Sequence, residues 1–378
     1  KYLQEQRGDG RGLVVGTGTP IANSLAELFN LQRYLQPETL EVRGIDTFDA
    51  WSSVFAEITQ KTEVDATGQY KPQQRLARYA NLPELRGLAG QVLDVVFAED
   101  LEGLERPPVS TSMIVSPASE QREGFMASLQ DRAQALGSVD PSEDNMLKIA
   151  TEGRLASVDQ RLVDPGADDE PESKVNELVA TVSRIAHDNP GTAQLVFLDI
   201  GHRPTGYNPD LDLRAEIKDK LAAAGIPKDK VEDFYPLTTR WKDVLAERLE
   251  GEHGWSREAA RTAAAAKTDH GVREVLQGHG VDADAARGLV REAKAELKAR
   301  KAERDRAEER LRRGESVVAI GSTETLGTGK NVQDRLIATH DLDVPWVPAS
   351  IEQRVRRMGR QGNQARQTYN YRYVGEKS

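Results

Sequence analysis

A series of short apolar runs, separated by helix-like segments, is the strongest constraint on how this chain can fold. Three runs are continuous, QLVFLDI (194–200), SVVAIGS (316–322) and LIATHDLD (336–343), and a fourth, QTYNYRYV (367–374), alternates. Continuous apolar runs of this length are typical of strands that are buried on both faces of a parallel sheet. Strands that alternate with helices along the chain therefore predict an α/β fold, with a parallel sheet flanked by helices.

Helix signals lie between these runs. Ser173 is expected to be an N-cap, because residues 175–186 follow with apolar side chains at helical spacing. The stretch VSTSMIVSPASEQREGF (109–125) predicts a strand that enters a helix near Ser119. Residues 164–173 carry acids and two prolines and predict an exposed linker. We expect residues 41–110 to be mostly helical, with loops around DATGQYKP and ERPP.

Residues 240–313 differ from the rest of the chain in composition. They are rich in Ala, Arg, Glu and Lys, which favour helices, and they are poor in large apolar residues. Two interpretations remain open: a solvated helical insertion, or a helical arm that contacts DNA or a neighbouring domain. Acids and bases are mixed along this segment, so no basic stripe is evident from the sequence.

Composition excludes several classes of protein. The chain has 378 residues, a net charge of −10 and no cysteine, so it has no disulfide, thiolate zinc site or cysteine nucleophile. Six scattered histidines do not suggest a metal site, and no apolar run approaches the ~20 residues that span a bilayer. No signal peptide is visible, and we expect a cytoplasmic protein. The missing initiator methionine and the abrupt start of the motifs suggest a fragment.

The stretch LVVGTGTPIANSLAELF (13–29) looks like a phosphate-binding loop. It predicts a strand, a tight turn at Gly16 and Gly18, and a helix that begins with a capping box of Ser24 and Glu27. A Walker A loop needs G-x-x-x-x-G-K-[ST], and this stretch contains no lysine. The later GTGKN (327–331) also fails, because Asn331 replaces the hydroxyl residue and Glu324 stands where the first glycine should be.

Basic charge is concentrated near the C-terminus. Between residues 321 and 378 there are nine bases and six acids, and four arginines lie within RVRRMGR (354–360). On a helix Arg354, Arg357 and Arg360 share one face, and only Glu352 is near enough in sequence to compensate them. Such a face meets an anion, a phosphate or a nucleic acid, with a solvated basic helix as the alternative. Gly327 and Gly329 follow a predicted strand and allow close approach of a ligand to the backbone.

Together these motifs resemble the C-terminal half of a Swi/Snf-type superfamily-two helicase motor. More narrowly, they are similar to large phage- and plasmid-borne proteins that join an adenine methyltransferase to such a motor. GTGTPIANS resembles motif III, QLVFLDI motif IV, GSTETLGTGKNVQ motif V and EQRVRRMGRQGN motif VI, while DVPWVP resembles the D-x-x-W-x-P after motif V. Arg356 stands where methyltransferase-linked members usually carry glycine, and Gly359 replaces a larger residue and is expected to weaken the arginine-bearing helix.

The resemblance implies a domain plan and a set of site residues. Residues 1–40 would end a first RecA-like lobe, 41–110 would link the lobes, and 111–378 would form a second RecA-like lobe with a helical insertion at about 205–310. Arg357 and Arg360 would be the catalytic arginine fingers. The remaining implied site residues are Gly327, Gly329 and Gln353 for the nucleotide, and Thr19, Asn23, Ser322, Thr323, Asn331 and Arg354 for DNA contact or coupling.

The implied activity is ATP hydrolysis coupled to movement on DNA. ATP would bind with Mg²⁺, whose ligands we expect upstream of Lys1, together with the Walker motifs. The implied partners are DNA, the first lobe of the same polypeptide and a linked adenine methyltransferase domain, with no membrane. We expect the chain alone to hydrolyse no ATP. A degenerate, non-catalytic nucleic-acid-binding module and an unrelated α/β nucleotide protein remain alternatives.

Overall fold

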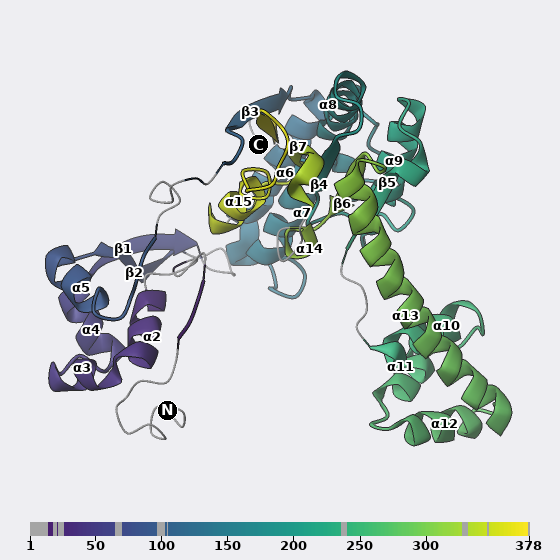
Figure 1. The fold of residues 1–378 in the computed structure, drawn as a ribbon, viewed down its shortest axis with the longest axis horizontal. Coiled ribbons are helices and arrows are strands. Elements are labelled where there is room, and N and C mark those ends of the chain that lie inside the picture. The colour runs from purple at the N-terminus through teal and green to yellow at the C-terminus, as the bar shows by residue number, and fades with distance from the viewer. Residues whose placement is uncertain are drawn as a thin grey trace.

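The computed structural model describes residues 14–17, 21, 26–64, 70–96, 103, 105–235, 240–326, 332–345 and 348–376. Three parts are visible along the chain (Figure 1): an N-terminal part with a β-hairpin, a sheet with helices on both faces, and a projecting group of helices. Thr19, Asn23, Gly327, Gly329 and Asn331, all predicted site residues, lie outside the described residues.

The N-terminal part packs around aromatic residues. Phe29, Trp51 and Phe55 are buried, and Trp51 Nε1 donates a 2.8 Å hydrogen bond to Gln32 Oε1. Val14 and Val15, expected to lie in a strand, have no regular secondary structure. None of the described strands pairs with them, and a strand needs such a neighbour to satisfy its backbone hydrogen bonds. The elements of this part are α2 (Ala26–Leu35), α3 (Pro37–Val42), α4 (Phe48–Phe55), β1 (Ala56–Val64), β2 (Tyr70–Tyr79) and α5 (Leu82–Ala89).

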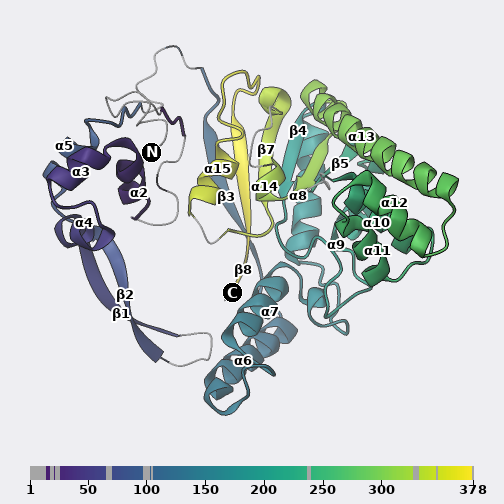
Figure 2. The ribbon, with the colours of Figure 1, turned by 90° about the horizontal axis from the view of Figure 1, so that it is seen from below.

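The expectation that residues 41–110 are mostly helical is wrong in one respect. β1 and β2 pair antiparallel over their whole length and form a long hairpin (Figure 2). Four of the nine residues of β1 are β-branched, which favours an extended backbone over a helix. The polar character of the segment hides this preference from a search for apolar periodicity.

The sheet confirms the predicted α/β fold. Its six strands run in the order β3-β8-β7-β4-β6-β5, and every neighbouring pair is parallel. Each of the five strand predictions in this region corresponds to one of its strands. The strands are β3 (Val109–Ser116), β4 (Ala193–Phe197), β5 (Val231–Phe234), β6 (Val318–Gly321), β7 (Leu336–Asp341) and β8 (Thr368–Gly375).

Helices cover both faces of this sheet. On one face, α8 (Lys174–Asp188) and α9 (Leu213–Ala223) pack through residues such as Leu178, Val182 and Ile217. Helices α6 (Glu120–Ala135) and α7 (Met146–Val158) precede them and are joined by a 3₁₀ turn at 136–138. Ser173 is the N-cap of α8, as predicted, and Ser119 is the N-cap of α6, near where a helix was expected to begin; each side chain accepts a hydrogen bond from a backbone N–H. Further 3₁₀ turns lie at Gln160–Leu162, Lys228–Lys230 and Gln333–Arg335.

On the opposite face of the sheet, three segments of the chain contribute buried side chains. Ala307 and Leu311 come from the end of a long helix, Leu326 from α14 (Thr323–Leu326), and Met358 from the segment after α15 (Pro348–Val355). Met358 is fully buried, so the backbone of residues 356–360 is fixed against the sheet. This anchoring positions the arginines on either side of it.

The projecting helices form a module with its own core. They are α10 (Trp241–Gly251), α11 (Arg257–Ala265), α12 (Asp269–Gly278) and α13 (Ala283–Arg313). Helix α13 joins the other three helices to the sheet (Figure 1). Its C-terminal end lies at the sheet and is followed by Gly314, whose φ of 70° suits glycine. The insertion therefore begins after the sheet strand β5, not at about residue 205, because α9 and β5 belong to the sheet.

Within the described ranges, no helix is both long enough and apolar enough to cross a bilayer.

Candidate functional site

Polar side chains gather where three neighbouring strands end. Asp199 follows β4, Thr323 follows β6, and Asp341 and Asp343 lie at and just after the end of β7. β4 lies between β6 and β7 in the sheet, so the parallel register brings these carboxyl ends together. In open α/β sheets, ligands bind in the crevice at the carboxyl ends of the strands. This edge is therefore the candidate site.

Arg354 of α15 joins these strand ends. Its guanidinium donates to Asp199 Oδ2 at 2.7 Å, to Asp341 Oδ1 at 3.0 Å and to Asp343 Oδ1 at 3.2 Å. Its Nε donates to Thr323 Oγ1 at 2.8 Å, and its Nη1 also donates to the Asp343 carbonyl at 2.6 Å. The side chain is fully buried and stacks over the Phe197 ring at 4.8 Å. We call this group the Arg354 cluster.

Electrostatics within the Arg354 cluster are strongly coupled. Burial opposes the charge of Arg354, but the three carboxylates raise the pKa of the guanidinium. Burial raises the pKa of Asp343, although Arg354 and the backbone N–H groups of Asp199 and Ile200, at 2.8 and 3.0 Å, stabilise its charged form. A buried guanidinium with several carboxylate partners is a structural crosslink between strands.

This geometry changes the interpretation of Arg354. Its donors are engaged inside the lobe and its side chain has no exposed surface, so a direct contact with a DNA backbone is disfavoured. The claim that only Glu352 compensates the arginines is also wrong, because Asp199, Asp341 and Asp343 come from other strands. Asp343 begins the quoted DVPWVP motif and Asp199 is the second-to-last residue of QLVFLDI, so both acids stood in motifs that the sequence had singled out.

Arg357 and Arg360 do not lie on a helix. α15 ends at Val355, and residues 356–362 form turns and bends. Arg357 is only 4% exposed, while Arg360 is half-buried. Burial and the neighbouring Arg360 guanidinium lower the pKa of Arg357 to about 10. Two cations are therefore held close together in a partly desolvated position, an arrangement that an anion would stabilise.

Gly359 lies outside α15, so it cannot weaken that helix as expected. A Cβ on Gly359 would lie 3.3 Å from Val109 Cγ2, which is a close contact with strand β3. The small residue thus lets the arginine-bearing turn approach the edge of the sheet. Arg356 is exposed and pairs with Glu352 at 3.1 Å, a solvent-facing contact of small energetic weight.

The remaining described candidates lie around the same strand ends. Thr323 donates its N–H to Asp199 Oδ1 at 2.5 Å and its hydroxyl to Asp199 Oδ2 at 2.7 Å. The Ser322 hydroxyl lies 3.1 Å from Thr325 Oγ1 and is a local contact of the turn after β6. Gln353 is half-buried on α15, next to Arg354. The structure thus brings Ser322, Thr323, Gln353 and Arg354 to one edge of the sheet.

Lys174 is a residue that the sequence analysis did not single out as functional. It is the first residue of α8 and is 7% exposed. Burial and the nearby Arg122 lower its pKa to about 8, while Asp343 of the Arg354 cluster acts in the opposite direction. The only sequence signal was its position directly after the N-cap Ser173. An electrostatic link to Asp343 cannot be read from residues that lie 169 positions apart.

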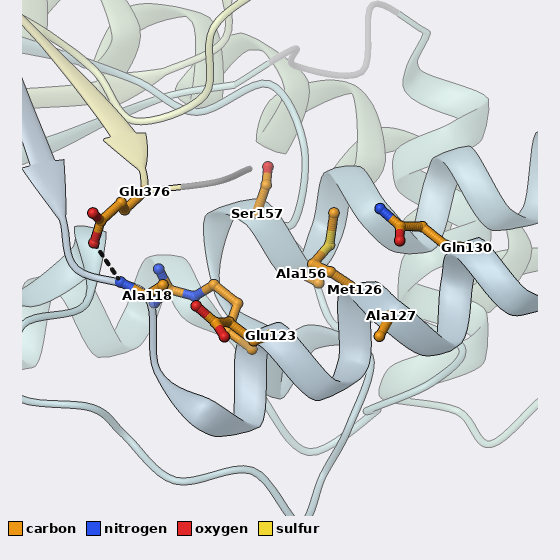
Figure 3. A pocket seen from close by; sticks show the side chains of 9 residues that line it. Ala118, Glu123, Met126, Ala127, Gln130, Ala156, Ser157 and Glu376 are labelled. Carbon is orange, nitrogen blue, oxygen red and sulfur yellow. Dashed lines mark hydrogen bonds between the residues drawn. The ribbon is translucent and has the colours of Figure 1, made fainter.

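A separate cavity of about 220 Å³ lies between α6, α7 and the end of β8 (Figure 3). Ala118, Met126 and Ser157 contribute to its lining, and Glu376 Oε2 accepts a 3.4 Å hydrogen bond from the Ala118 N–H. None of the residues that line it was a sequence candidate, and none belongs to the Arg354 cluster.

The residues of this site offer different ligands to the phosphates of ATP and to Mg²⁺. Guanidinium forks such as those of Arg357 and Arg360 suit phosphate oxygens. Within the described residues no set of three or more His, Cys, Asp or Glu side chains could hold a metal ion. The carboxylates of Asp199, Asp341 and Asp343 surround the Arg354 guanidinium instead. The described residues therefore offer guanidiniums that suit phosphate, while the carboxylates at the strand ends are engaged with Arg354.

Comparison with known sequences finds a similarity to a helicase family model at the start of the chain. Residues 1–96 match a family model described as a probable helicase domain. "Defense against restriction protein B" of Escherichia phage P1 is 26% identical over 136 residues, which is 35% of this chain. That match spans only 6% of the phage protein, so this chain corresponds to a small part of it.

Two solved structures are similar at low sequence identity. The Sulfolobus solfataricus SWI2/SNF2 ATPase core in complex with dsDNA is 11% identical with a TM-score of 0.35, over 95% of this chain and 56% of that chain. The C-terminal part of the Fun30 ATPase domain is 9% identical with a TM-score of 0.26, over 72% of this chain and 87% of that chain. At TM-scores this low, the sheet order itself carries the assignment of the fold.

Proposed function

We propose that residues 111–378 form the second RecA-like lobe of an ATP-dependent DNA translocase of the Swi/Snf type. On this proposal residues 1–40 end the first lobe and 41–110 connect the two. The lobe completes an ATP site that the first lobe begins. The match of residues 1–96 to a helicase family model supports this plan from the other end of the chain.

The observation that carries the proposal is the cationic pair beside the strand ends. Arg357 is buried next to Arg360, and its pKa is lowered to about 10, so the fold holds positive charge at a cost. Met358, between them in sequence, is fully buried and fixes the turn. Desolvation and the neighbouring Arg360 guanidinium both disfavour the charge of Arg357. Phosphate oxygens arriving from a partner lobe would offset the repulsion.

The residues then take distinct roles. Arg357 and Arg360 are the arginine fingers that stabilise charge on the γ-phosphate oxygens, an effect of order 10³–10⁵ in rate in related phosphoryl-transfer enzymes. Arg354 is a positioning residue, because it ties α15 to three strand ends and so sets where the turn begins. Gln353, beside it, contacts the nucleotide.

Other residues remain part of the proposal by resemblance. Gly327 and Gly329 place backbone near the nucleotide, and Thr19, Asn23 and Asn331 contact DNA or couple the lobes. Ser322 and Thr323 couple the lobes through the Arg354 cluster, since Thr323 contacts both Asp199 and Arg354. Mg²⁺, held by first-lobe residues, would neutralise phosphate charge. A linked adenine methyltransferase domain also belongs to this proposal.

Coupling to DNA follows from the lobes closing on ATP and opening after hydrolysis. The fingers reach their ligand only in the closed state, so one lobe moves relative to the other in each cycle. Residues that contact the DNA backbone on both lobes convert this motion into translocation.

The test uses the polypeptide that carries both lobes. We expect Arg360→Ala to lower DNA-stimulated ATP hydrolysis by at least about 10³-fold while ATP binding is retained. Arg356→Ala is the matched control, since Arg356 is exposed and pairs only with the exposed Glu352 among the residues described. Hydrolysis at the wild-type rate in Arg360→Ala would refute the finger assignment. A non-catalytic module would show no hydrolysis even in the wild type.

A further inference from the structure

Helix α13 carries a row of basic side chains that the sequence alone did not reveal. Five bases are spaced by three or four residues, so they share one face of the helix. The row spans 14 residues, or about 21 Å at 1.5 Å per residue. We call it the basic stripe; its members are Arg287, Arg291, Lys294, Lys298 and Lys301.

The two acids within residues 287–301 of α13 lie on a different face and are already paired. Glu292 and Glu296 lie near Arg248 of α10, at 3.1 and 3.9 Å, and Glu296 also pairs with Arg300 at 2.6 Å. The mixture of signs in the sequence therefore separates in space into a paired face and a basic face. The basic face was not evident from the sequence, because acids and bases are mixed along the chain.

The basic stripe borders a groove between α12 and α13 of about 270 Å³. Arg273 of α12 faces it together with Arg287, Arg291 and Lys294 of the stripe. Asp269 is the single acid of the lining, and it pairs with Lys294. Arg287 pairs with Asp284, which is 88% exposed, so both of these ion pairs are open to solvent and weak.

Three members of the basic stripe have no such pairing. Arg291, Lys298 and Lys301 are exposed and form no ion pair with any residue in the described ranges. In a chain with a net charge of −10, a one-sided row of unneutralised bases is a local exception. Like charges along one helix face repel one another and destabilise it slightly, so the row costs the fold something.

We propose that the basic stripe and Arg273 bind the phosphodiester backbone of DNA, as a second DNA contact outside the helicase motifs. A linear row of cations matches a linear polyanion better than it matches one small anion. Duplex DNA carries one negative charge per about 1.7 Å of its axis, so a 21 Å row meets several phosphates at once. The choice of DNA among polyanions rests on the proposed function, whereas the anion-binding surface itself does not.

The insertion gives this contact a mechanical role. α13 runs from the sheet, where Leu311 is buried, out to the α10–α12 module (Figure 2). A DNA segment bound along α13 is thereby attached to the second lobe and moves with it. Backbone contacts of this kind carry no sequence information and suit a translocating protein.

The test measures binding of the 378-residue chain to a fluorescent 30-base-pair duplex at several salt concentrations. The variant Arg291→Gln/Lys298→Gln/Lys301→Gln removes three unpaired bases. Its control, Lys148→Gln/Arg184→Gln/Lys228→Gln, removes three exposed bases elsewhere and changes the net charge equally. Circular dichroism checks that both variants keep their helices.

We expect the stripe variant to bind at least about tenfold more weakly at 100 mM salt, and the slope of log K against log salt to fall by about 2–3. The control should stay within about twofold of the wild type. Equal losses in both variants, no loss in either, or no DNA binding by the wild type would each overturn the proposal. An equal loss of binding to polyglutamate would overturn the assignment of DNA.

The result is separable from the test of the ATP site. Loss of DNA binding in the stripe variant supports this inference even if the two-lobe polypeptide proves not to hydrolyse ATP. Conversely, if the two-lobe polypeptide hydrolyses ATP but the stripe variant binds DNA as well as the wild type, this inference is overturned and the finger assignment stands.

Discussion

The Arg354 cluster and the basic stripe both contain arginine, but the positive charge is neutralised in the cluster and stays exposed in the stripe. Arg354 is fully buried, and three carboxylates from the ends of two strands surround it. Arg291, Lys298 and Lys301 are exposed on α13 and meet no acid in the described chain. One region cancels its charge inside the fold, and the other leaves its charge available.

The difference separates structure from binding. A buried pair holds its partners firmly, since removing one partner leaves the other charge desolvated. An exposed, unneutralised row contributes little to folding and can engage an external anion. Arg357 and Arg360 fall between these extremes, because Arg357 is buried and yet is destabilised by its neighbour. This contrast gives four predictions.

The largest effect is expected at Arg354. Replacing it with Met leaves three carboxylates without their shared partner, and we expect the free energy of unfolding at pH 7 to fall by about 3–5 kcal/mol. Arg356→Met, two residues away and exposed, should change it by less than about 0.5 kcal/mol. Urea denaturation of both variants measures the difference. Similar values would mean that Arg354 is not the crosslink described.

A smaller effect, with a defined pH dependence, is expected at Lys174. Its pKa of about 8 in the fold lies below the usual 10.5, so the unfolded chain binds more protons between these values. Stability should therefore rise with pH from 8 to 10.5, by at most about 3 kcal/mol. Lys174→Met should lose this rise and be more stable than the wild type at pH 7. A matching pH profile in the wild type and Lys174→Met would rule out the buried charge; exposed Lys148→Met is the control.

Replacing Arg357 should change the free energy of unfolding in the opposite direction to replacing Arg354. The fold lowers its pKa to about 10, so its charge is held at a cost. We expect Arg357→Met to raise the free energy of unfolding by about 1–2 kcal/mol, after allowance for solvent screening and lost contacts. The same variant should lose ATP hydrolysis in the two-lobe polypeptide. A large loss of stability would instead make Arg357 a structural residue like Arg354.

The smallest effect on stability is expected in the basic stripe. Neutralising Arg291, Lys298 and Lys301 together should change the free energy of unfolding by less than about 0.5 kcal/mol, because each side chain is exposed. Thermal unfolding followed by circular dichroism measures this. A loss of several kcal/mol would show that the stripe serves the fold and would remove the contrast with the Arg354 cluster.

Local patterns predicted much of the sheet lobe. The apolar runs 194–200, 316–322 and 336–343 became the buried strands β4, β6 and β7, because a strand covered on both faces must be apolar throughout. Helix starts were placed near Ser119 and at Ser173 from the change to a helical pattern after them, and both residues are N-caps in the structure. The β1–β2 hairpin was missed because its evidence is β-branching in a polar segment, a weaker signal than periodicity.

The geometry of the candidate site could not be predicted from the sequence. The sequence pointed to Arg354, Arg357 and Arg360 as one helical face, which fails because α15 stops at Val355. Helix ends depend on tertiary contacts, and here Met358 is drawn into the core against the sheet. The insertion boundary failed for a similar reason, since only pairing with β6 assigns β5 to the sheet.

By itself, the sequence determined the α/β class, most strands of the sheet and the concentration of arginines near the C-terminus, because apolar periodicity and charge are local properties of the chain. Tertiary structure alone decided which arginine is neutralised. Asp199, Asp341 and Asp343 reach Arg354 from the ends of two different strands, and Glu292 and Glu296 of α13 lie near Arg248 of α10. Charge compensation depends on distance in space, and distances between remote residues are set only when the sheet and the helices pack.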